Sequence, residues 1–269
     1  MTKKTLLKPL CAFILSFFVL THSQGLFAQI NAVSFDYLKI NDSGLDAPIS
    51  SIYRDSKGYM WFGNNDPRTL FQFDGYDYKK YKNNPEDPRS ISHESVFSFC
   101  EDKSGSLWIS TFSGLNRFNR KDATFDRLYL HKVTKKVLTG NFLLRAGFDH
   151  ENTLWVKEAV TGIFTRKNSE KHFRPLIFDK DYLFNIVPEY VSYLYLAKSG
   201  KVWFSTDNAR NSNPVLYCYN SKNKKYTSFA HIPDESSSLN WNNSLNFFED
   251  SHEKLWIMLF GGGIRPKNA

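Results

Sequence analysis

Five of the six tryptophans recur at nearly equal distances along the 269-residue chain. The intervals are 47, 47, 48 and 53 residues, and the five are Trp61, Trp108, Trp155, Trp203 and Trp256. Only Trp241 lies outside the series. A fixed period of this size is typical of repeated supersecondary units, each of which packs on its neighbours to bury a core. The spacing therefore predicts one repeat domain.

Each recurring tryptophan follows a polar turn of four residues. The turn begins with aspartate in four copies, and this side chain can bond backbone amides two residues ahead; the four are Asp55, Asp102, Asp149 and Asp250. Its fourth residue tolerates positive φ at low cost; these residues are Gly58, Gly105, Asn152 and Gly200. In copy four Ala197 replaces the aspartate, and in copy five Glu253 replaces the glycine. We expect these two turns to be the weaker ones.

Short apolar or aromatic runs surround every tryptophan strand. A first strand precedes the turn at 49–53, 96–100, 193–196 and 245–248. A third strand follows at 70–73, 114–118 and 162–166, and a fourth at 78–81, 124–128, 171–174 and 226–229. Four short antiparallel strands per repeat are typical of a propeller blade. The sequence predicts an all-β fold, an incomplete β-propeller of about four and a half four-stranded blades. An ordinary β-sandwich with coincidental tryptophan spacing is the alternative.

The composition agrees with packed sheets, because 16% of the residues are aromatic and no long helical periodicity is present. Large aromatic side chains fill the space between sheets that pack face to face. The segment 35–40 resembles the outermost strand of a blade whose other strands come from the far end of a complete propeller. After residue 265 the strand pattern predicts an aromatic residue, but Pro266 follows. We expect proline to interrupt the strand there.

Residues 1–28 have the features of a secretory signal peptide. Three lysines precede an apolar stretch of eleven residues at 10–20, which is short for a bilayer span. Cleavage after 25 or after 28 fits the small residues there, and an uncleaved anchor is the alternative. The domain assignment is therefore a signal peptide at 1–28 and a partial propeller at 29–269. Removing the leader lowers the formal net charge from +8 to +5.

The residues give little support for catalysis, a metal or a cofactor. The seven histidines are scattered, and no zinc-binding or nucleophile-elbow motif is present. We predict no catalytic residues, no metal and no cofactor. Cys100 and Cys218 are interpreted as buried free thiols, with a disulfide as the alternative. The basic residues are dispersed over turns, so no nucleic-acid partner is expected.

Loops that follow the tryptophan strands are the candidate ligand sites. Loops on one rim of a propeller face its central channel and can carry binding, whereas strand residues form the core. Polar planar groups beside aromatic residues suit sugar hydroxyls. The candidate residues are Asn64, Asp66, Arg68, Asp207, Asn208 and Arg210. Ordinary solvated turns have the same composition and are the alternative.

Residues 101–118 read EDKSGSLWISTFSGLNRF, and this stretch resembles the two-component regulator propeller repeat. Connectors at 84–91 and 233–239 are similar to that family's link between blades. The resemblance extends from about residue 33 to 264 and is strongest in the first two copies. Copy three departs from it with Lys157 and Glu158 in place of small residues, and copy four lacks the aspartate.

The resemblance implies the extracytoplasmic sensor of a hybrid two-component system, common in gut Bacteroidetes. Its expected partners are an oligosaccharide or other small ligand and, in the full-length receptor, a second copy in a dimer. The implied location is periplasmic, with membrane attachment only through a C-terminal part that these residues do not include. The chain itself is not expected to be an enzyme, although the parent would be a sensor histidine kinase. A stand-alone exported binding or scaffold propeller, or a propeller enzyme acting on carbohydrate, are the alternatives.

The chain stops in the fifth repeat, and a fragment of a longer gene would explain this. A partial propeller exposes a sheet face that stacked repeats normally bury. We therefore expect poor solubility or oligomerisation of the isolated product.

Overall fold

The computed structural model describes residues 48–65, 68–130, 143–159, 162–176, 191–197, 199–206, 216–230, 232, 234–235, 238–239, 244–252, 254–259 and 263–267. All of them belong to one compact unit, Ile40–Ala269. The expected signal peptide at 1–28 and the expected strand at 35–40 lie outside the described residues.

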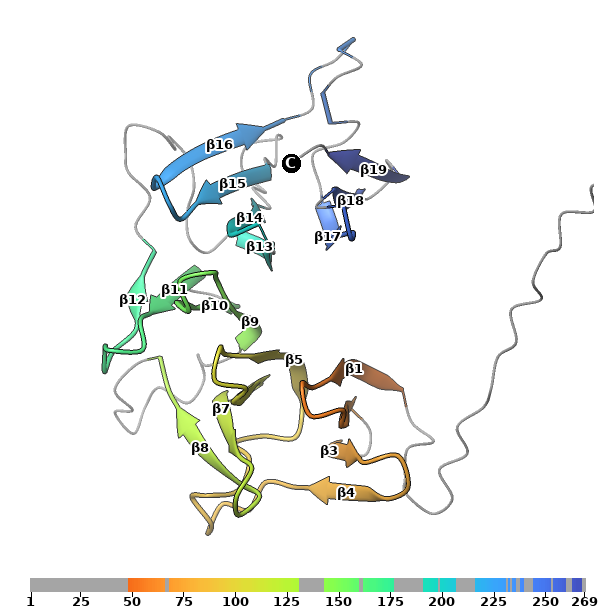
Figure 1. Ribbon diagram of the computed structural model, residues 1–269, viewed down its shortest axis with the longest axis vertical. Helices are drawn as coiled ribbons and strands as arrows, with labels where there is room; N and C mark the ends of the chain where they lie inside the picture. Colours follow the sequence, from red (N-terminus) through yellow and green to blue (C-terminus); the bar gives the residue numbers. More distant parts are fainter. Residues whose placement is uncertain are drawn as a thin grey trace, which may run out of the picture. The chain divides into compact units, whose positions relative to one another are not determined.

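The described regular structure is entirely β, in five antiparallel sheets that follow one another along the chain (Figure 1). We call these sheets blades 1 to 5. Blade 1 contains β1 (Ile49–Arg54), β2 (Met60–Asn65), β3 (Arg68–Phe73) and β4 (Tyr78–Tyr81). Blade 2 contains β5 (Val96–Glu101), β6 (Leu107–Thr111), β7 (Gly114–Asn119) and β8 (Thr124–Leu128).

The remaining blades repeat this order of strands. Blade 3 contains β9 (Leu143–Phe148), β10 (Leu154–Glu158), β11 (Gly162–Arg166) and β12 (Arg174–Pro175). Blade 4 contains β13 (Val191–Leu196), β14 (Lys201–Thr206), β15 (Leu216–Asn220) and β16 (Lys225–Phe229). Blade 5 has three described strands, β17 (Ser244–Glu249), β18 (Leu255–Leu259) and β19 (Gly263–Lys267). The predicted propeller of four-stranded blades is confirmed.

Two strand predictions differ from the structure. The fourth strand of blade 3 was expected at 171–174, but β12 contains only Arg174 and Pro175. Contact with β11 lies later in the chain than expected, because the amide of Leu176, just after Pro175, donates to the carbonyl of Ile163 at 2.8 Å. The fifth blade was expected to lose its strand at Pro266, yet β19 continues to Lys267. Pro266 pairs with Trp256 on β18, and no strand is described on its other side, a position where proline is tolerated.

Consecutive blades meet through their first strands. Contacts join β1 to β5, β5 to β9, β9 to β13 and β13 to β17, and Figure 1 shows β5 beside β9. Close approach requires a residue without a side chain at Gly63 on β2. A Cβ built there would lie 2.9 Å from Cβ of Val96 on the next blade's first strand. A larger residue at this position would have to displace Val96 and also Ser51 of the same blade, whose Oγ would lie 2.5 Å from that Cβ.

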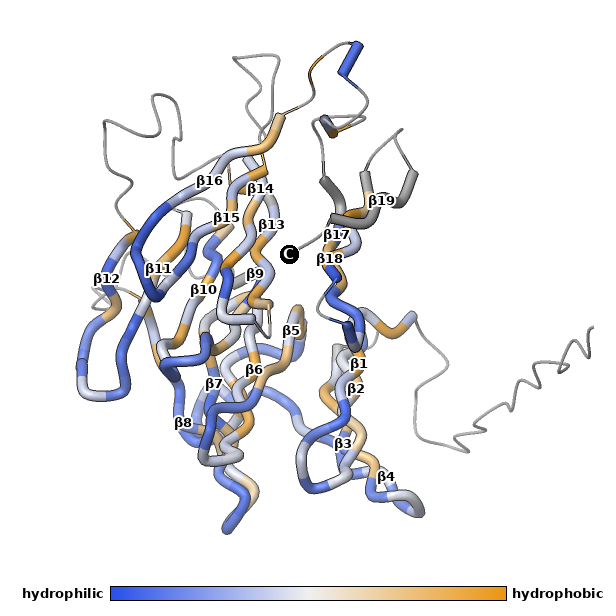
Figure 2. Tube along the Cα trace, turned by 45° about the horizontal axis from the view of Figure 1, so that its top comes forward, coloured by the Kyte–Doolittle hydropathy of each residue, from blue (hydrophilic) through white to orange (hydrophobic). Residues whose placement is uncertain are grey.

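In each of blades 1 to 4, the face that carries the tryptophan packs against the next blade. Trp61, Leu70 and Tyr81 of blade 1 form one buried cluster with Leu107 and Ile109 of blade 2. Equivalent clusters join blade 2 to blade 3, blade 3 to blade 4 and blade 4 to blade 5. Figure 2 shows hydrophobic residues within strands such as β14 and hydrophilic residues along outer turns such as the one between β11 and β12.

The tryptophan side of blade 5 exposes apolar side chains. Phe248 is 63% exposed and Met258 is 43% exposed, and they line a hollow of about 370 Å³ with Trp256. On the first strand of blade 1, Ile52 is 60% exposed. Self-association of the isolated chain was expected because a partial propeller exposes an apolar sheet face. These side chains form such a face, and self-association stays a prediction. The described residues form no helix long and apolar enough to cross a membrane.

Candidate functional site

The recurring turn and its tryptophan are joined by one carboxylate. In blade 1, Oδ1 of Asp55 accepts hydrogen bonds from the backbone N–H of Lys57 and of Tyr59, both at 2.9 Å. The other oxygen, Oδ2, accepts one from Nε1 of Trp61 at 2.9 Å. We call these three bonds the Asp–indole clamp. The clamp ties a turn on the surface to an indole in the core.

The clamp recurs in three other blades, with indole bonds of 2.8 to 3.0 Å. The donors are Ser104, Ser106 and Trp108 for Asp102, Glu151, Thr153 and Trp155 for Asp149, and His252, Lys254 and Trp256 for Asp250. The carboxylate in blade 5 thus has all three bonds, although Glu253 replaces the glycine. The indole bond was not anticipated from the sequence.

Blade 4 has the same turn without the carboxylate. The amide of Ala197 donates to the carbonyl of Lys201 at 2.9 Å, and that of Gly200 donates to the carbonyl of Ala197 at 3.0 Å. Gly200 has a φ of +84°, close to the +75° of Gly105 in blade 2. The backbone and the positive-φ residue therefore suffice for the turn shape. In blade 3 Asn152 supplies the same conformation, with a φ of +63°.

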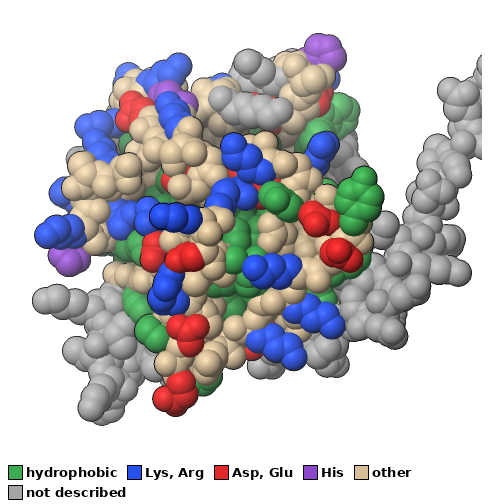
Figure 3. Space-filling model, turned by 60° about the horizontal axis from the view of Figure 1, so that its bottom comes forward, with side chains coloured by type: hydrophobic (Ala, Val, Ile, Leu, Met, Phe, Trp, Pro, Cys, Tyr) green, Lys and Arg blue, Asp and Glu red, His purple; other side chains and the backbone are tan. Residues whose placement is uncertain are grey.

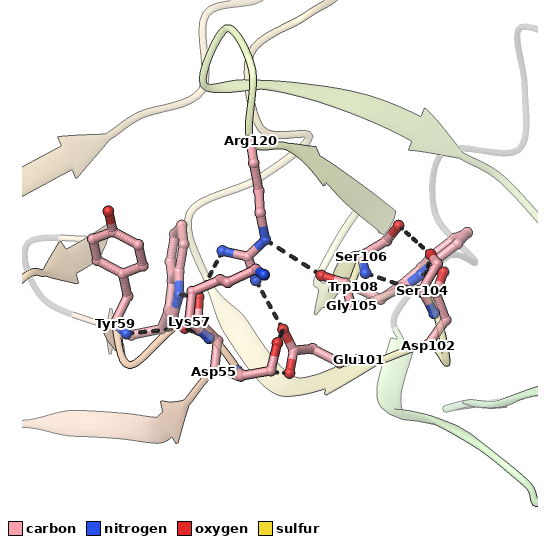
Figure 4. Close-up of polar contacts among 12 residues, drawn as sticks. Asp55, Lys57, Tyr59, Glu101, Asp102, Ser104, Gly105, Ser106, Trp108 and Arg120 are labelled. Atoms are coloured by element: carbon pink, nitrogen blue, oxygen red, sulfur yellow. Dashed lines mark hydrogen bonds and ion pairs between the residues drawn. The ribbon is translucent and has the colours of Figure 1, made fainter.

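A second polar network joins blades 1 and 2 (Figure 4). Arg120, in the turn between β7 and β8, donates to Oδ2 of Asp55 and to Oε1 of Glu101, both at 2.8 Å. It also donates to the carbonyl of Gly105 at 3.3 Å. Glu101 in turn accepts hydrogen bonds from the amide and hydroxyl of Ser56 in blade 1. The guanidinium of one blade is thus held by the clamp carboxylate of the previous blade.

The clamp carboxylates of blades 1 and 2 are held in their ionised form. Burial acts to raise the pKa of Asp55, but hydrogen bonds from Trp61 and Arg120, with the charge of Arg120, hold that pKa below its usual range. Burial also acts to raise the pKa of Asp102. Hydrogen bonds from Ser104 and Trp108 outweigh this effect, so the pKa of Asp102 is lowered as well. Hydrogen bonds that favour the charged form shift a carboxyl in this direction.

A cleft of about 700 Å³ opens next to this network, between the outer strands of blade 1 and the β7–β8 turn of blade 2. Its polar lining includes Lys57, Tyr59, Gln72, Asp77, Lys79 and Arg120. Tyr78, Tyr81 and Phe118 provide aromatic surface in the same cleft. A volume of this size, with a few polar groups among aromatic ones, is typical of small-molecule sites. On the face in Figure 3, acidic and basic side chains are intermixed around exposed hydrophobic ones.

Of the ligand residues expected from the sequence, only Asn64 has a described side chain, and it does not line this cleft. Asn64 is fully buried at the end of β2, and Arg68 begins β3. The other expected residues, Asp66, Asp207, Asn208 and Arg210, lie outside the described residues, as does the side chain of Arg68. The cleft is formed instead by the turns before the tryptophan strand and between the third and fourth strands. Its residues are far apart in sequence, and no local motif indicated them.

Lys157 is the least expected side chain in the core. It is 1% exposed on β10, at the position of Gly63 in blade 1 and Ser110 in blade 2. Burial lowers its pKa to about 8, against the opposing charge of Glu158. The ammonium donates to the carbonyl oxygens of Glu158 and Ala159. Backbone carbonyls thus compensate a charge that the repeat pattern does not predict.

Neither a metal site nor a disulfide is found in the described part of the chain. No group of three or more potential metal ligands is present there. Cys100 and Cys218 are both free. Burial raises the pKa of Cys218 to about 11 and raises that of Cys100 still further, so both thiols stay protonated at neutral pH. Such thiols behave as small apolar side chains rather than as nucleophiles.

Comparison with known families supports the sequence resemblance. Residues 43–66 and 90–113 match the family model of the two component regulator propeller. These stretches contain the clamp of blade 1 and the first two strands and turn of blade 2. No curated protein matches the chain.

Several solved structures share the fold at low sequence identity. The extracellular domain of a B. thetaiotaomicron protein is described once as a one-component and once as a hybrid two-component system. Its two structures match with TM-scores of 0.60 and 0.58, at 20% and 18% identity, over 82% and 83% of this chain. The matched region covers only 29% and 31% of those structures, so this chain spans less than a third of their length.

Two further propellers have different roles. Virginiamycin B lyase from Staphylococcus aureus matches with a TM-score of 0.53 and 15% identity, over 82% of this chain and 70% of the lyase. PorZ, a surface component of the type-IX secretion system of Porphyromonas gingivalis, matches with a TM-score of 0.57 and 10% identity, over 86% and 33%. At these identities the likeness establishes the fold. The chain is a β-propeller protein, and the stretches that match the two component regulator propeller model lie in its first two blades.

Proposed function

We propose that this propeller is an extracytoplasmic ligand-sensing module of a hybrid two-component system and that its ligand is an oligosaccharide. The observation that carries the proposal is the match of the regulator propeller family to blades 1 and 2, which fold as complete four-stranded blades. In this proposal the 269 residues form one portion of a membrane-anchored periplasmic receptor, whose kinase lies in another part. The module itself is not catalytic.

The cleft between blades 1 and 2 supports a binding role. Tyrosine and phenylalanine surfaces alternate there with an amide, a carboxylate and amines, which can hydrogen-bond hydroxyl groups in either direction. Arg120 lines the cleft and also holds Asp55 and Glu101. A ligand that contacts Arg120 would therefore touch the group that joins two blades. In the full-length receptor we expect this signal to pass through rearrangement of a dimer.

A glycan array followed by calorimetry tests the proposal. The purified chain is expected to bind a defined class of oligosaccharide, and Lys79→Ala in the cleft is expected to weaken binding. The loops identified from the sequence are tested in parallel with Arg68→Ala and Arg210→Ala. If no glycan of any class binds, the sensing proposal is wrong. If only the loop variants lose affinity, the ligand lies at the loops and not in the cleft.

An enzymatic role is the second candidate, because virginiamycin B lyase shares the propeller fold. The described residues contain no group of three or more potential metal ligands, and three cleft residues, Gln72, Tyr81 and Arg120, already have structural partners. Incubation of the purified chain with polysaccharides is expected to give no product. Turnover that Lys79→Ala or Asp77→Asn abolishes would favour the enzyme. A neighbouring reading frame with more blades, a membrane helix and a kinase would favour the sensor over a stand-alone scaffold.

A further inference from the structure

The third strand places one side chain opposite each tryptophan, and only one of these side chains is a cation. Trp108 on β6 pairs with Arg117 on β7. The residues at the same place in the other blades are uncharged: Gln72, Thr165, Cys218 and Pro266. Blade 2 therefore differs from the other four at the edge of its indole.

The position at which the next blade covers the indole carries a cation in blade 3 and, by strand register, also in blade 5, where it is Lys267. Phe118 of blade 2 contacts Trp61 with ring centroids 4.9 Å apart, and Tyr219 of blade 4 contacts Trp155 at 5.5 Å. At the same position of blade 3, Arg166 lies with its guanidinium carbon 5.8 Å from the centre of the Trp108 ring. The junction of blades 2 and 3 thus has arginine where two other junctions have an aromatic ring.

Two guanidinium groups therefore share one indole. Arg117 lies 6.0 Å from the centre of the Trp108 ring, and Arg166 also lies 5.6 Å from that of Phe173. Cation–π contact stabilises each guanidinium. Burial lowers the pKa of Arg166, and the nearby charge of Arg117 lowers it further. The two like charges repel each other at this junction.

The carboxylates near this pair compensate it only in part. Arg117 forms an ion pair with Asp126 at 2.8 Å, but both side chains are at least half exposed, and such pairs are weak. Arg166 forms no ion pair among the described side chains, and its buried Nε has no hydrogen-bond partner there. Glu170, whose charge acts on Arg166, is bound to Arg174 at 2.9 Å. A buried donor without an acceptor is unfavourable, so the charge of Arg166 is poorly compensated within the described residues.

We propose that Arg117 and Arg166 form an anion-recognition site at the junction of blades 2 and 3, and that it binds a carboxylate of an acidic oligosaccharide. The proposal rests on the proposed sensing of an oligosaccharide and adds the class of sugar. Planar guanidinium groups accept a carboxylate through two parallel hydrogen bonds, which a neutral hydroxyl cannot reproduce. Lys167 and Lys171, in the turn after Arg166, add positive charge that attracts such a ligand.

The test is calorimetry with oligogalacturonate, its fully methyl-esterified form and the galacturonate monomer. The wild-type chain is expected to bind oligogalacturonate and to lose roughly ten-fold or more in affinity for the ester. Arg166→Tyr and Arg117→Gln install the residues that other blades have at these positions. Each is expected to weaken oligogalacturonate binding by roughly ten-fold or more while leaving the melting temperature unchanged or higher. Arg89→Gln, which removes a surface ion pair with Asp122, is the control and should bind like the wild type.

Each result decides the proposal. Equal binding of acid and ester, or normal binding by both arginine variants, overturns it. Binding of neutral glycans alone overturns the arginine site but leaves the sensing function in place, whereas no binding of any glycan overturns both. If the monomer binds as tightly as the oligomer, the site recognises a small carboxylate and not a glycan chain, which overturns the assigned ligand class.

Discussion

The turns before Trp108 in blade 2 and before Trp203 in blade 4 have the same backbone bonds and the same positive-φ glycine. In blade 2 the first residue of the turn is Asp102, which binds the indole of Trp108, whereas in blade 4 it is Ala197. The comparison separates two roles that the sequence combines in one motif. Backbone hydrogen bonds and the glycine shape the turn, whereas the aspartate connects that turn to the buried indole. Blade 4 shows that the fold tolerates loss of the second role.

The largest effect is expected when a clamp that also holds another blade is removed. Asp55→Ala eliminates two amide bonds, the indole bond and the partner of Arg120, and we expect a loss of about 3–5 kcal/mol in the free energy of unfolding. Asp102→Ala removes a clamp with no arginine and is expected to cost about 1–3 kcal/mol. Denaturant titration measures both. Equal losses would show that Arg120 contributes nothing through Asp55.

Acid should weaken the clamped blades. The pKa values of Asp55, Asp102 and Asp250 are lowered in the folded state. For Asp250 the cause is hydrogen bonding from Trp256 and Lys254. A lowered folded-state pKa gives stability that is fully present above the unfolded value of about 3.9 and is lost as the pH falls through the folded value.

We therefore expect the free energy of unfolding attributable to these groups to be constant from about pH 8 to pH 5 and to fall below about pH 4. Asp102→Asn should flatten that fall, and equilibrium unfolding at a series of pH values measures it. An acid limb as steep in the variant as in the wild type would contradict the assignment.

Restoring the missing clamp should stabilise blade 4 by a smaller amount. Ala197→Asp places a carboxylate where the other four blades have one, within reach of the amides of Ser199 and Lys201 and of Trp203. We expect a gain of about 1 kcal/mol, the typical worth of a hydrogen bond. The control is Ala197→Asn, which keeps an acceptor without the charge. A large loss of stability would mean that the packing around Ala197 has no room for the clamp.

The smallest effect is expected at the third turn. Asn152 adopts positive φ and also accepts a hydrogen bond at 3.0 Å from the amide of Lys103 in blade 2. Asn152→Gly relieves the backbone and loses the bond, so the two effects should cancel to within about 0.5 kcal/mol. Asn152→Ala loses the bond and keeps the unfavourable φ, and thermal unfolding should find it about 1 kcal/mol less stable. Equal melting temperatures for the two variants would exclude a backbone effect.

The sequence predicted the blades because their signal is local. Strands β4 and β8 were predicted at their observed bounds, and the positive φ of Gly58 and Asn152 followed from residue type. The indole bond could have been inferred, since Asp102 and Trp108 are six residues apart and so are Asp55 and Trp61. The residue pattern alone indicated only the turn role of the aspartate.

Contacts between blades were beyond local reasoning. Arg120 is 65 residues from Asp55, and no pattern along the chain indicates that they meet. The cleft beside them is likewise made of turns that only the stacking of blades brings together. The arginine pair became visible once strand register aligned Arg117 with uncharged residues in the other blades and Arg166 with aromatic residues in blades 2 and 4. The short length of β12 and the continuation of β19 through its proline depend on which strand edges are paired. Edge pairing is a tertiary property.

The most direct test of the account is nuclear magnetic resonance of the tryptophan indole N–H groups in the folded chain. Four of them, in Trp61, Trp108, Trp155 and Trp256, are predicted to exchange slowly with solvent and to resonate at positions typical of hydrogen bonds to carboxylates. Asp55→Ala, Asp102→Ala, Asp149→Ala and Asp250→Ala should each shift and deprotect the indole of its own blade, while Ala197→Asp should move Trp203 toward the group of four. Indoles that exchange alike and do not respond to the aspartate of their own blade would contradict it.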